Sequence, residues 1–308
     1  MSTRRRAAIA TALPRGIGAI ATALLGLVVL AAFASPAQAA PAMWEVSDGT
    51  HKVVLFGSVH VLPVGTQWRT PAFDAALAAA PEVYFETDIG PLGVLALTAK
   101  MVVLGFQSAG TSWVGQLTPA QLAELKPALA AIGMTPGQAD RFPPWVAELQ
   151  IAQGTITGGK TGAAAPGPGV DAQLQTELPK QRKAFFETPG QDFDLLAGDP
   201  LSVQIAQLFQ TIESGQPTAA TGLDAVVSAW AAGDVADIAT TLKSTDPQDI
   251  AREQRLLFDR NRNWVPIIEG MLKAGDQDLI VVGAAHLAGD GSVLDLLGQA
   301  GYTVTRVQ

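Results

Sequence analysis

The order of apolar and polar residues along the chain predicts short buried strands that alternate with longer amphipathic helices. Leu201, Ile205, Leu208 and Ile212 repeat at the three- and four-residue spacing of one buried helix face. The strand-like runs are short, rich in β-branched and aromatic residues, and bounded by turn residues. Strands that alternate with helices predict an α/β domain with a central, mostly parallel or mixed sheet flanked by helices. The predicted strands span 42–47, 52–60, 82–88, 183–188, 279–286 and 302–307.

Threonine–proline pairs mark where helices begin. Thr70 and Thr118 each precede a proline, which places a side-chain cap before a residue whose backbone angle already suits a helix. Gly133 is the expected stop of the second of these helices. A largely apolar helix is predicted over 92–104, and a long helix from Pro247 through Trp264.

A glycine-, alanine- and proline-rich stretch over 154–169 divides the chain and reads as a mobile surface loop. The tripeptide Phe85-Glu86-Thr87 at the end of one predicted strand is repeated as Phe186-Glu187-Thr188 on the other side of this loop. Two interpretations of residues 40–308 stay open: the chain forms two related half-domains, or it forms one undivided domain.

The first 39 residues have the order of a secretory signal. Basic residues at Arg4-Arg5-Arg6 and Arg15 precede the apolar run 17–33, and Ala37-Gln-Ala39 is a small-x-small cleavage site. The alternative is a membrane anchor, since the apolar run approaches the length of a span. Cleavage near Ala39 is the favoured interpretation. We therefore expect a periplasmic or secreted protein with no stable membrane span after cleavage.

The charge of the mature chain argues against binding to nucleic acid. Removal of residues 1–39 leaves 16 basic and 28 acidic residues, a net charge of −12, which repels polyanions. The chain has no cysteine, so disulfides, thiolate metal ligands and a cysteine nucleophile are excluded.

Two of the three histidines share one local pattern. His60 and His286 each stand at the end of a predicted strand and three residues after a glycine, in Gly57-x-x-His60 and Gly283-x-x-His286. The loops that follow the strands of α/β folds carry reactive groups, because the sheet holds them rigidly. A structural, hydrogen-bonded histidine is the alternative for either residue taken alone. The shared pattern predicts one site that uses both.

Glu86 is the predicted third member of this site, because it is an acid at the end of an otherwise apolar strand. Two neutral imidazoles and a carboxylate are a common ligand set for a catalytic divalent ion. Alternatively, Glu86 would stand beside the ion as general base. Asp88 and Glu187 are the next choices, although Glu187 could instead cap the helix that follows it.

Arginines of the long helix offer a place for a substrate group. Most such arginines form a solvated face, but one of them would hold a substrate carboxylate or orient Glu86, and Arg260 with Asn261 is the predicted pair. Glu187 joins them as a predicted substrate-binding residue. No phosphate-binding loop, Gly-x-Ser-x-Gly elbow or His-Glu-x-x-His helix occurs.

The motifs of this chain resemble those of the TraB/GumN family. The relatives of that family include the Tiki metalloproteases and, more distantly, the erythromycin-esterase and ChaN-like proteins. The resemblance spans nearly all of the mature chain, and the paired Gly-x-x-His is the family's signature. The matching motifs are Trp44, Leu55-Phe-Gly57-Ser-Val-His60, Glu86, Gly169-Val-Asp171, Glu187-Thr188, Arg260-Asn261-x-x-Trp264 and Val282-Gly283-Ala-Ala-His286-Leu287.

The resemblance implies a divalent metal, with Mn²⁺ or Co²⁺ favoured and Zn²⁺ or Fe²⁺ as alternatives, bound at His60, Glu86 and His286. It also implies peptide-bond hydrolysis around these same three residues. The expected function is therefore an exported, metal-dependent hydrolase that acts on a peptide or small molecule. Two alternatives stay open: a non-catalytic protein of the same fold that binds a peptide, a metal or haem, and a hydrolase of esters or carbohydrates.

Overall fold

The computed structural model describes residues 40–90, 112–158, 166–214, 221–241 and 247–308, with single positions between 93 and 103. The chain divides into two compact units, Met1–Gln38 and Ala39–Gln308. The predicted leader and most of the predicted helix over 92–104 lie outside the described residues. Within the described ranges, no helix has the length and apolar character that a membrane crossing requires.

A six-stranded mixed sheet organises the second unit, with strand order β6-β4-β7-β2-β1-β8. β1 pairs antiparallel with both its neighbours, and the other pairings are parallel. The predicted α/β fold with a mixed sheet is confirmed. The six strands are β1 (Met43–Ser47), β2 (Lys52–Ser58), β4 (Val83–Phe85), β6 (Lys183–Phe185), β7 (Leu279–Gly283) and β8 (Thr303–Arg306).

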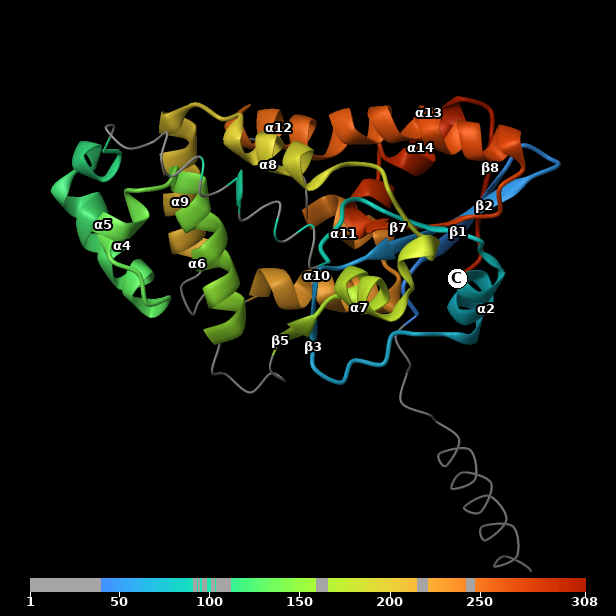
Figure 1. Ribbon diagram of the computed structural model, residues 1–308, viewed down its shortest axis with the longest axis horizontal. Helices are drawn as coiled ribbons and strands as arrows, with labels where there is room; N and C mark the ends of the chain where they lie inside the picture. The colour runs from blue at the N-terminus through green and yellow to red at the C-terminus, as the bar shows by residue number, and fades with distance from the viewer. Residues whose placement is uncertain are drawn as a thin grey trace, which may run out of the picture. The chain divides into compact units, whose positions relative to one another are not determined.

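Helices cover both faces of the sheet, as Figure 1 shows. Every residue of β7 from Leu279 to Val282 is buried, as expected for a central strand with helices on both sides. Edge strand β8 is mostly exposed and carries two threonines and an arginine. One face packs against α2 (Pro71–Ala79), α7 (Val170–Glu177), α10 (Thr221–Ala232) and α11 (Val235–Thr241), and the other against α13 (Asp259–Ala274) and α14 (Val293–Gln299).

A third apolar cluster is formed mainly by helices. Leu125, Leu129, Ile151 and Leu208 are buried at its centre. This cluster accounts for the apolar face predicted over 201–212. Its helices are α4 (Pro119–Ala131), α5 (Pro136–Ala139), α6 (Pro144–Gly158) and α9 (Leu201–Ser214).

The predicted helix starts at the Thr–Pro pairs are confirmed. The side chain of Thr70 accepts a hydrogen bond from the backbone N–H of Phe73 at the start of α2. Thr118 and Gln121 form a reciprocal capping box at the start of α4. Gly133 adopts a positive φ of 72° just beyond that helix, which is the left-handed conformation that glycine accepts at low cost.

The predicted loop over 154–169 is too long at both ends. Helix α6 continues to Gly158, and Pro166–Pro168 forms β5, which pairs with β3 (Val61–Pro63). The strands of the two halves also alternate across the sheet, since β4 lies between β6 and β7. The two halves therefore contribute strands to one shared sheet.

The long helix predicted from Pro247 is interrupted by a turn of π-helix. α12 (Pro247–Glu253) is followed by the π segment η3 (Gln254–Phe258) and then by α13. A π turn accommodates an extra residue and often accompanies a functional site. Here it comes directly before Arg260. The remaining short elements are α8 (Pro189–Ala197), η1 (Val114–Gln116), η2 (Lys180–Arg182) and η4 (Ala284–Leu287).

Candidate active site

The predicted site residues meet at the carboxyl edge of the four parallel strands. His60 follows β2, Glu86 follows β4, and Glu187 follows β6. The ladder extends past the strand ends, since the N–H of Glu187 donates to the carbonyl of Glu86 (2.9 Å). His286 was predicted on a strand, but β7 ends at Gly283 and His286 lies in the 3-10 turn η4. Parallel strands all end at one edge, so groups far apart in sequence become neighbours there.

His60 is the exposed member of the site. Its side chain is 70% exposed, and its Nδ1 donates to Oδ2 of Asp171 (3.0 Å). The other carboxylate oxygen of Asp171 accepts from the hydroxyl of Ser58 (2.7 Å). Asp171 is itself buried. The carboxylate therefore fixes the ring, and Nε2 is the ring nitrogen left for a substrate or ligand.

A close approach of two backbones brings Asp171 to His60. The N–H of Gly169 donates to the carbonyl of His60 (3.0 Å), and the N–H of Val170 donates to the carbonyl of Val59 (3.0 Å). A Cβ on Gly169 would lie 2.1 Å from the carbonyl oxygen of Val59. Only glycine allows this approach, and α7 then begins with Asp171 in its first turn. Sequence reasoning assigned Asp171 no role; the available signal was an acid two residues after a glycine at a helix start.

Replacing Asp171 with asparagine should return the pKa of His60 to its ordinary range. The hydrogen bond from Asp171 raises the pKa of His60 to about 9, because a carboxylate favours the charged imidazolium. An amide oxygen still accepts from Nδ1 but carries no charge. The Asp171→Asn variant should therefore titrate at or below about 6.5, measured from the pH dependence of the His60 proton resonances. An unchanged titration would contradict this assignment, and the His51 resonance is the internal control.

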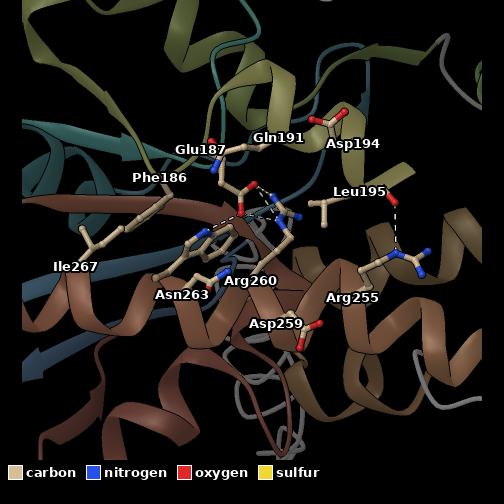
Figure 2. A pocket seen from close by; sticks show the side chains of 11 residues that line it. Phe186, Glu187, Gln191, Asp194, Leu195, Arg255, Asp259, Arg260, Asn263 and Ile267 are labelled. Carbon is tan, nitrogen blue, oxygen red and sulfur yellow. Dashed lines mark hydrogen bonds and ion pairs between the residues drawn. The ribbon is translucent and has the colours of Figure 1, made fainter. Parts of the chain in front are cut away.

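Arg260 is clamped between two carboxylates. Its Nη2 donates to Glu86 (2.7 Å) and to Glu187 (2.8 Å), and its Nε donates to both oxygens of Glu187 (3.0 Å each). Its guanidinium lies 4.9 Å from the ring centre of Trp264, whose indole N–H also donates to Glu187 (2.9 Å). Figure 2 shows the Arg260 and Glu187 side chains pointing at one another. Of the two roles predicted for Arg260, the contact to Glu86 corresponds to orienting that carboxylate.

His286 is buried and held in one tautomer. The amide nitrogen of Asn261 donates to the carbonyl of Gly291 (2.9 Å), so its oxygen faces Nδ1 of His286 (2.6 Å) and accepts from it. Nε2 then carries the lone pair and accepts from Nη1 of Arg260 (3.2 Å). Asn261, predicted as a substrate-binding residue, is 1% exposed and positions His286 in this structure.

The environments of the ionisable groups differ sharply. Burial lowers the pKa of His286 to about 4, so this ring is neutral at neutral pH. Burial would raise the pKa of Glu86, but the positive charges around it lower it to about 2. One oxygen of Glu86 also accepts from the N–H of Gly283 (2.6 Å). Glu86 is therefore a stable carboxylate rather than a proton acceptor at neutral pH.

Asp88 and Glu187 were the next choices after Glu86 for the third site residue. Asp88, a second choice for the site, accepts from the N–H of Gly90 in a turn and makes no hydrogen bond or ion pair with His60, Glu86 or His286 among the described residues. Glu187 does not cap α8, because that role belongs to Thr188, whose hydroxyl accepts from Gln191.

The described arrangement does not fit a metal ion held jointly by His60, Glu86 and His286. In the described ranges, no three His, Cys, Asp or Glu side chains are grouped as metal ligands. Oε2 of Glu86 and Nε2 of His286 lie 3.7 Å apart, and both face the guanidinium of Arg260. The permanently charged guanidinium of Arg260 therefore lies at the position predicted for the metal ion.

Comparison with known proteins identifies the family and leaves the activity open. No curated protein and no solved structure matches the chain. The sequence model described as the TraB/PrgY/gumN family matches residues 42–306, which is nearly the whole chain and includes every residue of the site. The chain belongs to the TraB/PrgY/gumN family.

Proposed function

We propose that this chain is an exported hydrolase that cleaves peptide bonds at the carboxyl edge of its sheet. The observation that carries the proposal is the pair formed by exposed His60 and buried Asp171, beside the Glu86–Arg260 ion pair. A histidine oriented through Nδ1 by a carboxylate, with Nε2 exposed, is a common means of transferring a proton to or from a substrate.

Each residue has a distinct task in this proposal. His60 exchanges a proton with the substrate or with a water molecule at Nε2, while Asp171 holds the ring. Arg260 supplies a fixed positive charge near the reacting group, and its two carboxylate partners keep it in place. His286, which Asn261 positions, accepts a hydrogen bond from Arg260. Export rests on the predicted leader over residues 1–39, and N-terminal sequencing of the exported protein should begin near Ala40.

The proposal is tested with a mixture of short peptides of varied sequence. The mature chain is incubated with the mixture, and new termini are identified by mass spectrometry. Cleavage by the native protein that is lost in a His60→Ala variant is the expected result. Peptides that bind but remain intact would instead support the binding-protein alternative. A parallel set of p-nitrophenyl esters tests the ester-hydrolase alternative.

A divalent ion is a second candidate feature of the site. Two observations favour it: both imidazoles are hydrogen-bonded through Nδ1, to Asp171 and to Asn261, and two carboxylates, Glu86 and Glu187, share a single guanidinium. His60, Glu86 and His286 would hold the ion only in an arrangement that differs from the described one, in which Arg260 has moved away from both Glu86 and His286. Mn²⁺ or Co²⁺ is favoured by the family resemblance, and the ion would supply Lewis-acid activation of water.

If the site binds such an ion, its affinity should rise with pH. His60, whose pKa is about 9, must lose its proton to become a ligand, so binding releases a proton and tightens as pH rises towards 9. Calorimetric titration with Mn²⁺ at pH 6.5 and pH 8.5 measures this change. About one ion per chain in the native protein, lost in a His60→Ala/His286→Ala variant, would support the ion. No binding at either pH would exclude it.

A further inference from the structure

A cleft of about 500 Å³ opens directly beside Arg260. One wall is α8, and the other is the π segment with the start of α13 (Figure 2). The Arg260–Glu187 pair of the candidate active site lines the cleft between these walls. A group bound in the cleft would therefore contact the same ion pair that orients Glu86.

One end of the cleft is apolar. Figure 2 shows Phe186 and Ile267 together at this end, whereas Leu195 lies on the other side of Arg260, near Arg255. Ile267 is 41% exposed, and Phe186 stacks on Trp264 (5.1 Å between ring centres). An exposed aliphatic side chain beside an aromatic wall gains free energy when an apolar group covers it.

The charged groups of the cleft already have partners. Arg260 pairs with Glu187, and Arg255 donates to Asp199 (2.6 Å). Asp194 pairs with Lys100 (2.5 Å), and Asp259 with Arg262. A charged ligand group would lose water without an unpaired opposite charge to replace it, which is unfavourable. The lining therefore favours an uncharged ligand.

Two amides face the cleft from opposite walls. Gln191 on α8 uses its amide oxygen in the helix cap, and its NH₂ makes no hydrogen bond within the described ranges. Asn263 on α13 is exposed and makes no side-chain hydrogen bond among the described residues. Such amides suit the N–H and C=O groups of a peptide backbone.

We propose that this cleft binds an uncharged apolar side chain next to the bond that is cleaved, and that Ile267 determines this specificity. The inference rests on the proposed function, because it assigns the cleft to the substrate of the same site. Leucine and phenylalanine are the expected side chains, since a cleft of this volume accommodates either one. The bonds cleaved in a peptide mixture should accordingly have Leu or Phe at one fixed flanking position.

An Ile267→Asp variant tests the inference, with Ile250→Asp as its matched control. Ile250 is 48% exposed, lies on α12 and is absent from the cleft lining. Ile267→Asp should lower kcat/KM for Leu- and Phe-flanked peptides by about 10- to 100-fold, the usual discrimination of an apolar pocket. The control should have the same kcat/KM as the native protein. Melting temperatures of both variants equal to that of the native protein establish that they fold.

A binding measurement separates this inference from the proposed function. N-acetyl-L-leucinamide and N-acetylglycinamide are compared by saturation-transfer NMR on native protein and Ile267→Asp. Binding of the leucine compound alone, lost in Ile267→Asp, supports the cleft even if no peptide is cleaved. Cleavage without an apolar preference, or with equal losses in both aspartate variants, overturns the cleft assignment and leaves the hydrolase standing. Neither cleavage nor binding overturns both.

Discussion

Replacing His60 with alanine should lower kcat/KM by about 10²- to 10⁴-fold, the usual contribution of a positioned proton-transfer group. The same change should leave the protein folded with a modestly lower melting temperature, because buried Asp171 keeps its hydrogen bond from Ser58 but loses the imidazolium. The His60 side chain is 70% exposed, so its removal opens no cavity in the core. Hydrolysis of the peptide mixture and thermal unfolding, measured on the same preparations, separate the two effects.

His51 provides the matched control for this variant. It also pairs with an aspartate, Asp48, and its side chain is 42% exposed, but it lies in the β1–β2 turn away from the carboxyl edge. His51→Ala should retain full activity. Retention of activity by His60→Ala would place the reaction elsewhere in the chain, and unfolding of His60→Ala would show that the residue is structural.

Replacing Arg260 with alanine should destabilise the fold by about 3–5 kcal/mol, the usual cost of breaking a buried ion pair. The side chains of Glu86 and Glu187 are 12% and 8% exposed, and they would be left as two buried carboxylates with no guanidinium between them. Urea unfolding at pH 7 measures the loss. Activity should also fall, because Arg260 fixes the orientation of Glu86.

The neighbouring Arg262 is the control for the change in stability. It lies on the same helix and is 54% exposed, so Arg262→Ala should change the free energy of unfolding by less than about 0.5 kcal/mol. An Arg260→Ala/Glu86→Gln/Glu187→Gln variant should recover much of the loss, since it removes the unpaired charges. Equal effects of Arg260→Ala and Arg262→Ala on the free energy of unfolding would show that the ion pairs of Arg260 add no stability.

The cost of Arg260→Ala should shrink in acid. In the native protein, the pKa of Glu86 lies at about 2, below its ordinary value of 4.5. Glu86 therefore contributes stability that is fully present above pH 4.5 and is lost as pH falls towards 2. Without Arg260 the pKa of Glu86 should rise, because burial then acts unopposed by that charge. The gap between native and variant stability should accordingly narrow below pH 4.5, as unfolding at stepwise pH would show.

Local sequence signals predicted most of the strands and helices correctly. The caps at Thr70 and Thr118 succeeded because a threonine followed by proline acts within one helical turn and needs no distant partner. The π turn over Gln254–Phe258 was missed, because the helical period on either side continues through it. Strand β5 was missed for a related reason, since Pro166–Pro168 becomes a strand only through its pairing with β3.

The predicted active-site residues were brought together, but of their contacts only that of Arg260 with Glu86 was predicted. His60, Glu86 and Glu187 follow parallel strands, so sequence position and the shared edge were enough to group them. Asp171 was given no role, because it reaches His60 through α7, on the far side of the low-complexity stretch. The predicted metal ion was placed where Arg260 donates to Glu86, a contact between residues 174 apart.

The sequence by itself determined the alternation of strands and helices and the placement of the two Gly-x-x-His motifs at strand ends. The parallel pairing of β2 with β7 then brought both motifs to one edge of the sheet. Only the tertiary structure decided how the two histidines differ. The side chain of His60 is 70% exposed and bonded to Asp171, whereas that of His286 is 4% exposed and held between Asn261 and Arg260. Their tetrapeptides follow one pattern, so the difference arises from the elements that cover them. Exposure and pKa depend on partners distant in sequence, which no local pattern contains.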